Sequence, residues 1–274
     1  MSVPSMIGAR FDGLAGAMPC PFDVHAHTGA DIDGTVRSSE EHVADLAAVG
    51  GRSVIFPLRV TTGYGPENKR VIVEAKRYPD RLFPFARLDP KVDSDSVAAD
   101  ALAAGARGFK LHPRAEEFRL EHPGVDPILA VAAEARVPVV ICADHGVGSF
   151  GPMLGRLAAR HRGCPIVLAH AGISDLARLP ALIGDHPNLF FDTAWWNPAD
   201  LLALFSQVPP EQILYGSDAP YGDVAINLVT TIRCGLAAGL SIDEVALVAG
   251  GRLAQLLDGV SPASARLGSP LHDV

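Results

Sequence analysis

Residues 22–29 read FDVHAHTG, so two histidines stand two positions apart where an apolar stretch runs into Thr-Gly. Side chains at positions i and i+2 of a β-strand point to the same face of the sheet. We therefore expect His25 and His27 to lie side by side, with Asp23 one step further back on that face. Two neighbouring imidazoles at a strand end can chelate a metal ion, but they can equally be two polar residues in a turn. The residues elsewhere in the sequence distinguish between these two interpretations.

More apolar runs of strand length follow along the chain, and longer segments whose apolar residues recur at helical spacing separate them. The expected strands are 22–27, 53–58, 82–89, 107–112, 137–144, 165–170, 188–194 and 212–218. Eight strands that are each followed by a helix are typical of one α/β fold, the (β/α)8 or TIM barrel of about 250 residues. An open doubly wound sheet is the alternative, but it usually carries a Gly-rich loop after its first strand. Here His-Ala-His-Thr-Gly takes that place, which favours the barrel.

The composition fits one globular domain, because 48% of the 274 residues are hydrophobic and 20% are charged. We expect a single domain over residues 1–274, with the barrel core at about 20–258 and a tail at 259–274. The net charge of −8 and the lack of a Lys/Arg stripe argue against nucleic-acid binding. The sequence shows neither a signal peptide nor an apolar run of membrane-spanning length, and its four cysteines form no CxxC pair. A cytoplasmic protein without membrane contact is the expectation.

Residues that can bind a metal or move a proton gather at the carboxyl ends of the expected strands, which form the active-site face of a barrel. These residues are His25, His27, Lys110, His112, Asp144, His145, His170 and Asp218. Each of them alone has an ordinary explanation as a turn or cap residue. Their concentration at one end of a barrel predicts a metal site instead. The other histidines fall in expected helices, loops or the tail and are interpreted as solvated: His42, His122, His161, His186 and His272.

The donor types indicate which ion the site would take. Imidazole nitrogens with one carboxylate suit Zn²⁺ best, with Mn²⁺, Fe²⁺ or Co²⁺ as alternatives. Three or four protein ligands with one open position are typical of a catalytic metal rather than a structural one.

The chain resembles the amidohydrolase superfamily, and within it the amidohydrolase-related (amidohydrolase 2) group of metal-dependent TIM-barrel hydrolases and decarboxylases. The matching segments, in order, are DVHAH, RLFPFARLDP, GARGFKLHP, IVLAHAG and ILYGSDAP. The resemblance implies that His25 and His27 are metal ligands. It implies that Asp218 lies beside the metal and handles the proton of a water molecule. It makes His170 a ligand or a hydrogen-bond partner of that water or of the substrate.

The fifth strand departs from the family pattern. Members commonly carry a histidine about four residues after the proline of this strand, and counted from Pro138 that position is Cys142. The nearest histidine, His145, comes three residues later. We favour His145 as the fifth-strand ligand, and Asp144 and Cys142 remain alternatives.

Further residues are candidates for lining the pocket. The GFKLHP form of the fourth strand goes with a single metal in the family, so Lys110 and His112 are expected to line the pocket. Lys110 is either a hydrogen-bonded barrel residue or an anchor for an anionic substrate, and His112 is either a substrate contact or a packed neutral imidazole. Arg59 and Arg87 are candidates to clamp a carboxylate, and Trp195 to form an apolar wall. A surface or packing role is the alternative for each of the last three.

The resulting hypothesis is a metal-dependent hydrolase that cleaves an amide, lactone or ester bond of a small, anionic molecule with a metal-activated water. Asp218 would act as general base and then acid, and His170 would help to stabilise the oxyanion. The first alternative is non-oxidative decarboxylation of an aromatic or unsaturated acid at the same site. The second is a barrel that binds a metal or a small ligand without catalysis. The resemblance also suggests a homodimer.

Overall fold

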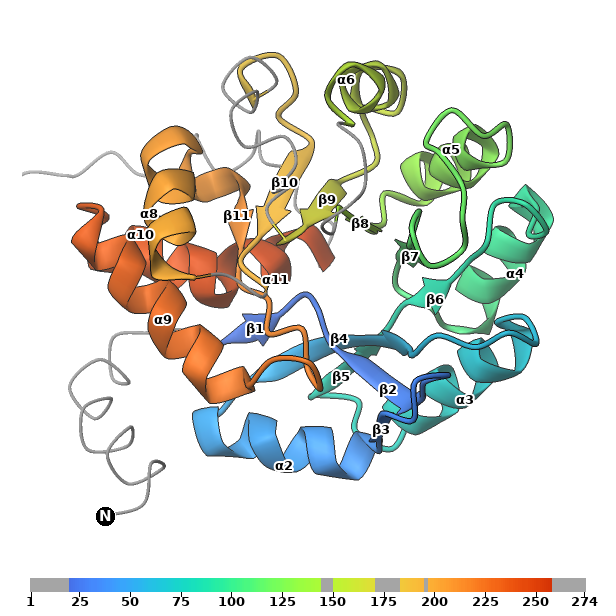
Figure 1. Cartoon of the computed structure of the whole chain (residues 1–274), viewed down its shortest axis with the longest axis horizontal. Coiled ribbons are helices and arrows are strands. Elements are labelled where there is room, and N and C mark those ends of the chain that lie inside the picture. Colours follow the sequence, from blue (N-terminus) through green and yellow to red (C-terminus); the bar gives the residue numbers. More distant parts are fainter. Residues whose placement is uncertain (1–19, 144–149, 171–182, 195–196, 258–274) are drawn as a thin grey trace, which may run out of the picture.

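The computed structural model describes residues 20–143, 150–170, 183–194 and 197–257, in which helices surround a set of mostly parallel strands (Figure 1). The strands are β1 (Phe22–Asp23), β2 (His27–Ala30), β3 (Val36–Arg37), β4 (Arg52–Pro57), β5 (Leu82–Pro84), β6 (Ala86–Arg87), β7 (Phe109–Leu111), β8 (Val139–Cys142), β9 (Ile166–Ala169), β10 (Leu189–Asp192) and β11 (Ile213–Leu214). The helices are α2 (Ser39–Val49), α3 (Gly65–Ala75), α4 (Asp95–Ala104), α5 (Val125–Ala135), α6 (Gly151–Arg160), α8 (Pro198–Gln207), α9 (Val224–Ala237), α10 (Ile242–Ala246) and α11 (Arg252–Leu257).

The strands run in two hydrogen-bonded series that join into a barrel. One series has the order β1-β4-β2-β3 with β5 beside β4, and the other runs β11-β10-β9-β8-β7-β6. Backbone hydrogen bonds connect the last strand to the first: Val24 N to Tyr215 O at 2.9 Å, Asp218 N to His25 O at 2.8 Å and His27 N to Ala219 O at 2.7 Å. Between β5 and β6, Phe85 N donates to Ile55 O at 2.9 Å, so these two short strands continue one another. The predicted α/β TIM barrel is confirmed.

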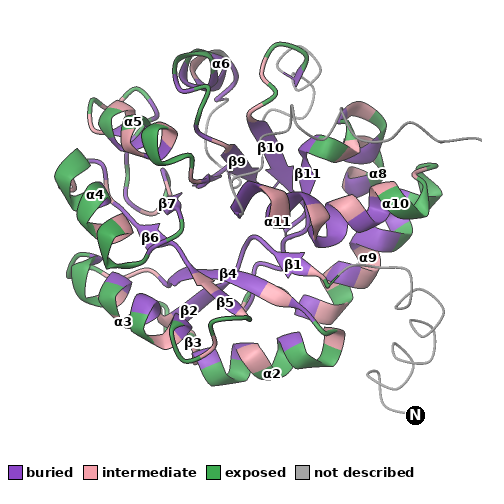
Figure 2. Cartoon of the chain, turned by 180° about the vertical axis from the view of Figure 1, so that it is seen from behind, coloured by how far each residue is buried: buried purple, intermediate pink, exposed green. Residues whose placement is uncertain are grey.

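Alternation of side chains along each strand divides the core in two. The residues that fill the barrel interior include Phe22, Val54, Phe56, Phe85, Val140, Val167, Phe190 and Leu214. Their strand neighbours, such as Ile141, Leu168 and Phe191, pack outward against the helices. Burial of each such side chain contributes roughly 1.5–3 kcal/mol. Figure 2 shows the buried strands at the centre and the exposed faces of the helices at the periphery.

Helix α2 illustrates how local sequence fixes an element. Ser38 accepts a hydrogen bond from Glu41 N while the Glu41 side chain accepts from Ser38 N, which is a capping box. Gly50 ends the helix with a φ of 64°, a left-handed conformation that glycine adopts without strain. Among the described residues, none of the helices has the length and apolar character needed to cross a membrane.

Two histidines that we interpreted as solvated are buried, and that interpretation was wrong. His42 faces inward from α2 and is fully buried. His161 follows α6 and is 6% exposed, with its Nε2 2.9 Å from Asp126 Oδ1. In both cases the packing of the helix against the barrel decides the burial.

Candidate metal centre

A one-residue bulge in the first strand sets the direction of its histidines. Phe22 pairs with Arg52 and His27 pairs with Phe56, so five steps along this strand match four steps along β4. A bulge of this kind redirects the side chains that follow it. His27 therefore shares the inward face of Phe56.

The two histidines lie side by side, as predicted, with ring centroids 5.3 Å apart. Asp23 does not extend this pair as a third member. Its Oδ1 accepts hydrogen bonds from the backbone N–H groups of His25 and Ser217, each at 2.9 Å, and its Oδ2 accepts one from the Ser217 hydroxyl. Burial, the largest influence, raises the pKa of Asp23 to about 7. Asp23 therefore fastens the last strand to the first.

A buried carboxylate fixes the tautomer of His25. Its Nδ1 lies 2.8 Å from Asp192 Oδ2, with both side chains almost fully buried. Because an ionised carboxylate accepts hydrogen bonds only, Nδ1 carries the proton and Nε2 carries the lone pair. Burial, and then the charge of Lys110, lowers the pKa of His25 well below its usual value, which keeps the ring neutral. A neutral imidazole whose Nε2 carries the lone pair is the form that binds a metal.

Asp218 lies between the two histidines of the first strand. Its Oδ1 is 3.2 Å from His25 Nε2 and 3.4 Å from His27 Nε2. Burial raises the pKa of Asp218, but the hydrogen bond with His27 and the nearby cationic groups outweigh it, so the net shift is downward. Burial lowers the pKa of His27 to about 4, against the opposing effect of Asp218. The centre thus combines neutral imidazoles with one ionised carboxylate.

His170, at the end of β9, completes this group. Its backbone N–H donates to Asp192 Oδ1 at 2.7 Å, its Nδ1 lies 3.3 Å from Ala194 O, and its side chain hydrogen-bonds that of Cys142. Burial lowers the pKa of His170, but the bond with Cys142 and the nearby carboxylates raise it to about 10. His170 and Asp218 both have left-handed backbones, with φ of 55° and 59°. Such a conformation costs a non-glycine residue roughly 1–3 kcal/mol and is common at functional sites.

These residues fit a divalent cation. Ligand atoms of His25, His170 and Asp218 lie within 4.8 Å of one another, and all three side chains are buried. Lys110 is fully buried as well, and its ammonium donates to His25 Nε2 at 2.9 Å. The position in front of this nitrogen therefore already accommodates a positive charge. Nitrogen and carboxylate donors of this kind match Zn²⁺ and the neighbouring transition-metal ions.

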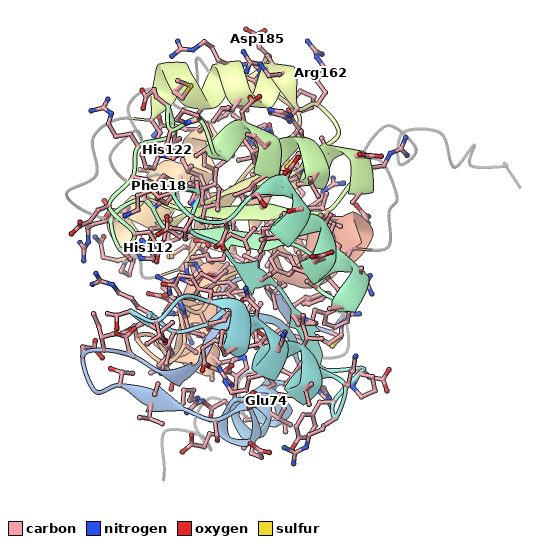
Figure 3. All side chains as sticks on the ribbon, turned by 90° about the vertical axis from the view of Figure 1, so that its right-hand side faces the viewer. Glu74, His112, Phe118, His122, Arg162 and Asp185 are labelled. Atoms are coloured by element: carbon pink, nitrogen blue, oxygen red, sulfur yellow. The ribbon has the colours of Figure 1, made fainter. Side chains whose placement is uncertain are left out.

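The other predicted pocket residues have different surroundings. Lys110 also stands over the Phe56 ring, 4.5 Å from its centroid. His112 is half-buried, and burial followed by the charges of Arg87 and Lys110 lowers its pKa well below its usual value. Figure 3 shows His112, Phe118 and His122 on one side of the molecule, along the segment that follows β7. Lys110 therefore lies at the metal centre, and the charge of His112 is among those that lower the pKa of His25.

Arg87 carries a charge that is already compensated. Its guanidinium is buried, and Nη2 lies 2.7 Å from Glu116 Oε1, which also accepts the Tyr64 hydroxyl at 2.6 Å. Arg59 has a half-buried side chain, and its backbone N–H donates to Asp31 Oδ2 at 3.1 Å. The predicted residues Asp144, His145 and Trp195 lie outside the described residues.

Sequence reasoning missed two carboxylates, Asp192 and Glu116. Asp192 ends β10 in the stretch FFDTA, and the position of an acidic residue at a strand end was a signal that pointed to it. Glu116 lies in the long segment after β7, where the sequence offers no comparable signal.

Comparison with known proteins agrees with this geometry. A family model described as Amidohydrolase matches residues 22–250. The chain belongs to the amidohydrolase family, and it is a metal-dependent hydrolase or a related carboxy-lyase of that superfamily. No curated protein gives a significant match.

Several solved structures share the fold. One is an uncharacterised TIM-barrel protein from Bordetella bronchiseptica, with 17% identity and a TM-score of 0.70 over 88% of this chain and 99% of that one. A second is a dihydroxybenzoic acid decarboxylase from Polaromonas sp. JS666 with bound manganese and the inhibitor 2-nitroresorcinol, with 12% identity and a TM-score of 0.68 over 90% and 99%. A third is a probable 2-pyrone-4,6-dicarboxylic acid hydrolase from Acinetobacter baumannii, with 14% identity and a TM-score of 0.62 over 88% and 100%. At these identities the similarity concerns the fold.

Proposed function

We propose that the protein is a metal-dependent hydrolase that cleaves an amide, lactone or ester bond of a small, anionic molecule. The observation that carries this proposal is the position of the Asp218 carboxylate, 3.2 and 3.4 Å from the Nε2 atoms of His25 and His27. A buried, ionised carboxylate between two neutral imidazoles is suited both to hold a cation and to accept a proton.

His25, His27 and Asp218 would hold one divalent ion, together with a donor from the fifth strand. Zn²⁺ is the ion that these donors favour, and Mn²⁺, Fe²⁺ or Co²⁺ are the alternatives. Such an ion would acidify a water molecule and polarise the carbonyl of the substrate. Asp192 would keep the lone pair of His25 directed at the ion, because it holds Nδ1 at 2.8 Å.

The chain's own residues would manage the protons and charges of the reaction. Asp218 would accept a proton from water and return it to the leaving group as general base and then acid. His170 would donate a hydrogen bond to the oxygen that gains negative charge, because its raised pKa, about 10, favours the protonated ring. Lys110 and His112 would contact the substrate from the fourth strand.

Decarboxylation at the same site is the alternative reaction. It would be favoured by a free arginine that faces the centre and clamps the substrate carboxylate. Arg87 instead pairs with Glu116 at 2.7 Å inside the protein, which leaves its charge compensated. Because of this pairing, Arg87 does not supply the carboxylate clamp that decarboxylation would need.

The experiment compares Asp218→Asn with the wild-type protein after reconstitution with Zn²⁺. Small lactones, amides and aromatic acids are the substrates, and metal content is measured by elemental analysis. We expect hydrolysis by the wild type, a 10²- to 10⁴-fold fall in kcat for the variant, and largely unchanged metal content. Asp100→Asn, an exposed change on α4, is the matched control. Unchanged turnover of the Asp218 variant would refute its role in proton transfer, and CO₂ release without hydrolysis would establish the decarboxylase.

A further inference from the structure

Cys142 ends β8 on the inward face of the barrel. Val140, two residues earlier on the same strand, belongs to the interior cluster with Val167 and Phe190. Because alternate side chains share a face, Cys142 points inward as well. It pairs in register with Ala169, the residue immediately before His170, and it is 2% exposed. The strand therefore carries this thiol to the level of the metal centre.

The side chains around Cys142 are those of the centre itself. Cys142 hydrogen-bonds the side chain of His170, which is one of the three clustered ligand groups. On the neighbouring strand β7, Lys110 pairs in register with Val140, two residues before Cys142, and its ammonium lies 2.9 Å from His25 Nε2. The compact cluster consists of His25, His170 and Asp218, so Cys142 borders it through His170.

Cys164 provides a contrast within the same protein. It is buried in the outer core, where its Sγ contacts the backbone carbonyls of Val137 at 3.8 Å and Pro165 at 3.7 Å. Burial alone raises the pKa of the Cys164 thiol. Cys164 thus behaves as an inert apolar side chain, whereas Cys142 hydrogen-bonds the imidazole of His170.

We propose that Cys142 Sγ, as a thiolate, is the fifth-strand ligand of the divalent ion, in place of His145. The inference rests on the proposed function, because it needs a metal at this centre. On binding, the S–H bond breaks, the sulfur lone pair forms the bond to the ion, and the proton leaves to solvent. The positive charge of Lys110 would offset the added negative charge of the sulfur.

A thiolate ligand has a consequence for metal selection. Sulfur is a soft donor and favours Zn²⁺ and Co²⁺ over the harder ions Mn²⁺ and Mg²⁺. The wild-type protein should therefore bind Zn²⁺ in preference to Mn²⁺, and Cys142→Ala should reduce that preference.

The experiment uses the full-length protein loaded with Co²⁺ and reads its absorption spectrum. A thiolate bound to Co²⁺ gives a charge-transfer band in the near ultraviolet, whereas nitrogen and oxygen ligands do not. We expect the band in the wild type and in two controls, Cys164→Ala and His145→Ala, and its loss in Cys142→Ala. Circular dichroism and elemental analysis establish that each variant is folded and how much Co²⁺ it holds.

The outcomes separate the two proposals. Stoichiometric Co²⁺ without the band in the wild type, or a band that persists in Cys142→Ala, overturns the Cys142 assignment and leaves the metal centre standing. Failure of the wild type to bind Co²⁺ or Zn²⁺ overturns both. If Cys142→Ala does not fold, X-ray absorption of the wild-type Zn²⁺ form decides, because a thiolate ligand places one sulfur at about 2.3 Å from the ion. A spectrum without sulfur at that distance refutes the assignment.

Discussion

His42 should make the stability of the protein depend on pH between neutral and mildly acidic conditions. Its side chain is fully buried in α2, and neither ring nitrogen has a hydrogen-bond partner among the residues that the structure describes. Burial, with smaller effects from the charges of Arg37 and His27, lowers the pKa of His42 to about 3. A histidine in the unfolded chain has a pKa of about 6.5. Between these two values the unfolded chain binds more protons, so the free energy of unfolding decreases as the pH falls below 6.5.

The magnitude follows from the separation of the two pKa values. Each pH unit between them costs about 1.4 kcal/mol, so a change from pH 7 to pH 5 should remove about 2 kcal/mol that is due to His42. His42→Leu removes the titrating group and keeps an apolar side chain of similar size. The difference in free energy of unfolding between this variant and the wild type should therefore shift by about 2 kcal/mol over that range, in favour of the variant at pH 5.

Urea denaturation at pH 7, 6 and 5 measures this difference, and other titrating groups cancel because both proteins share them. Ala47→Ser is the matched control on the exposed side of the same helix, and it introduces no titrating group. Its offset from the wild type should stay constant with pH. Parallel curves for the wild type and His42→Leu would show that the imidazole does not remain buried and neutral.

Other changes test the centre and its supports. Asp192→Asn should weaken metal binding by about 10- to 100-fold, because it removes the carboxylate that orients His25, and competition with a chromophoric chelator measures the affinity. Glu116→Ala should lower the free energy of unfolding by about 3–5 kcal/mol, because it leaves the buried Arg87 without its partner. A loss below about 1 kcal/mol in urea denaturation would contradict the importance of this pair. Ser38→Ala should cost about 1 kcal/mol through loss of the N-cap bond to α2, measured in the same way.

The barrel and its polar end could be predicted because they depend on local patterns. Apolar runs mark strands wherever the chain is buried on both sides, and the carboxyl ends of parallel strands must share one face. His25, His27, Lys110, His170 and Asp218 were found in this way. Their actual contacts with one another follow from the closure of the barrel.

The features of the fold and of the metal centre that the sequence did not predict depend on contacts between distant parts of the chain. The bulge between Phe22 and His27 arises from pairing with β4, so counting by two along the first strand placed Asp23 wrongly. Asp192 lies in the expected strand 188–194, but its contact with His25, 167 positions away, follows only from the closed barrel. His42 stands among polar neighbours in a helix, and packing on the barrel buries it.

The fastening of Asp23 to Ser217 has a consequence for the synthesis of the protein. These residues are 194 positions apart, and Asp218 follows directly after the second of them. A growing chain on the ribosome carries both first-strand imidazoles well before Ser217 and Asp218 are synthesised. Premature termination before Ser217 yields a fragment without the hydrogen bonds that join the last strand to the first, so this junction of the barrel forms only after the last strand has been synthesised.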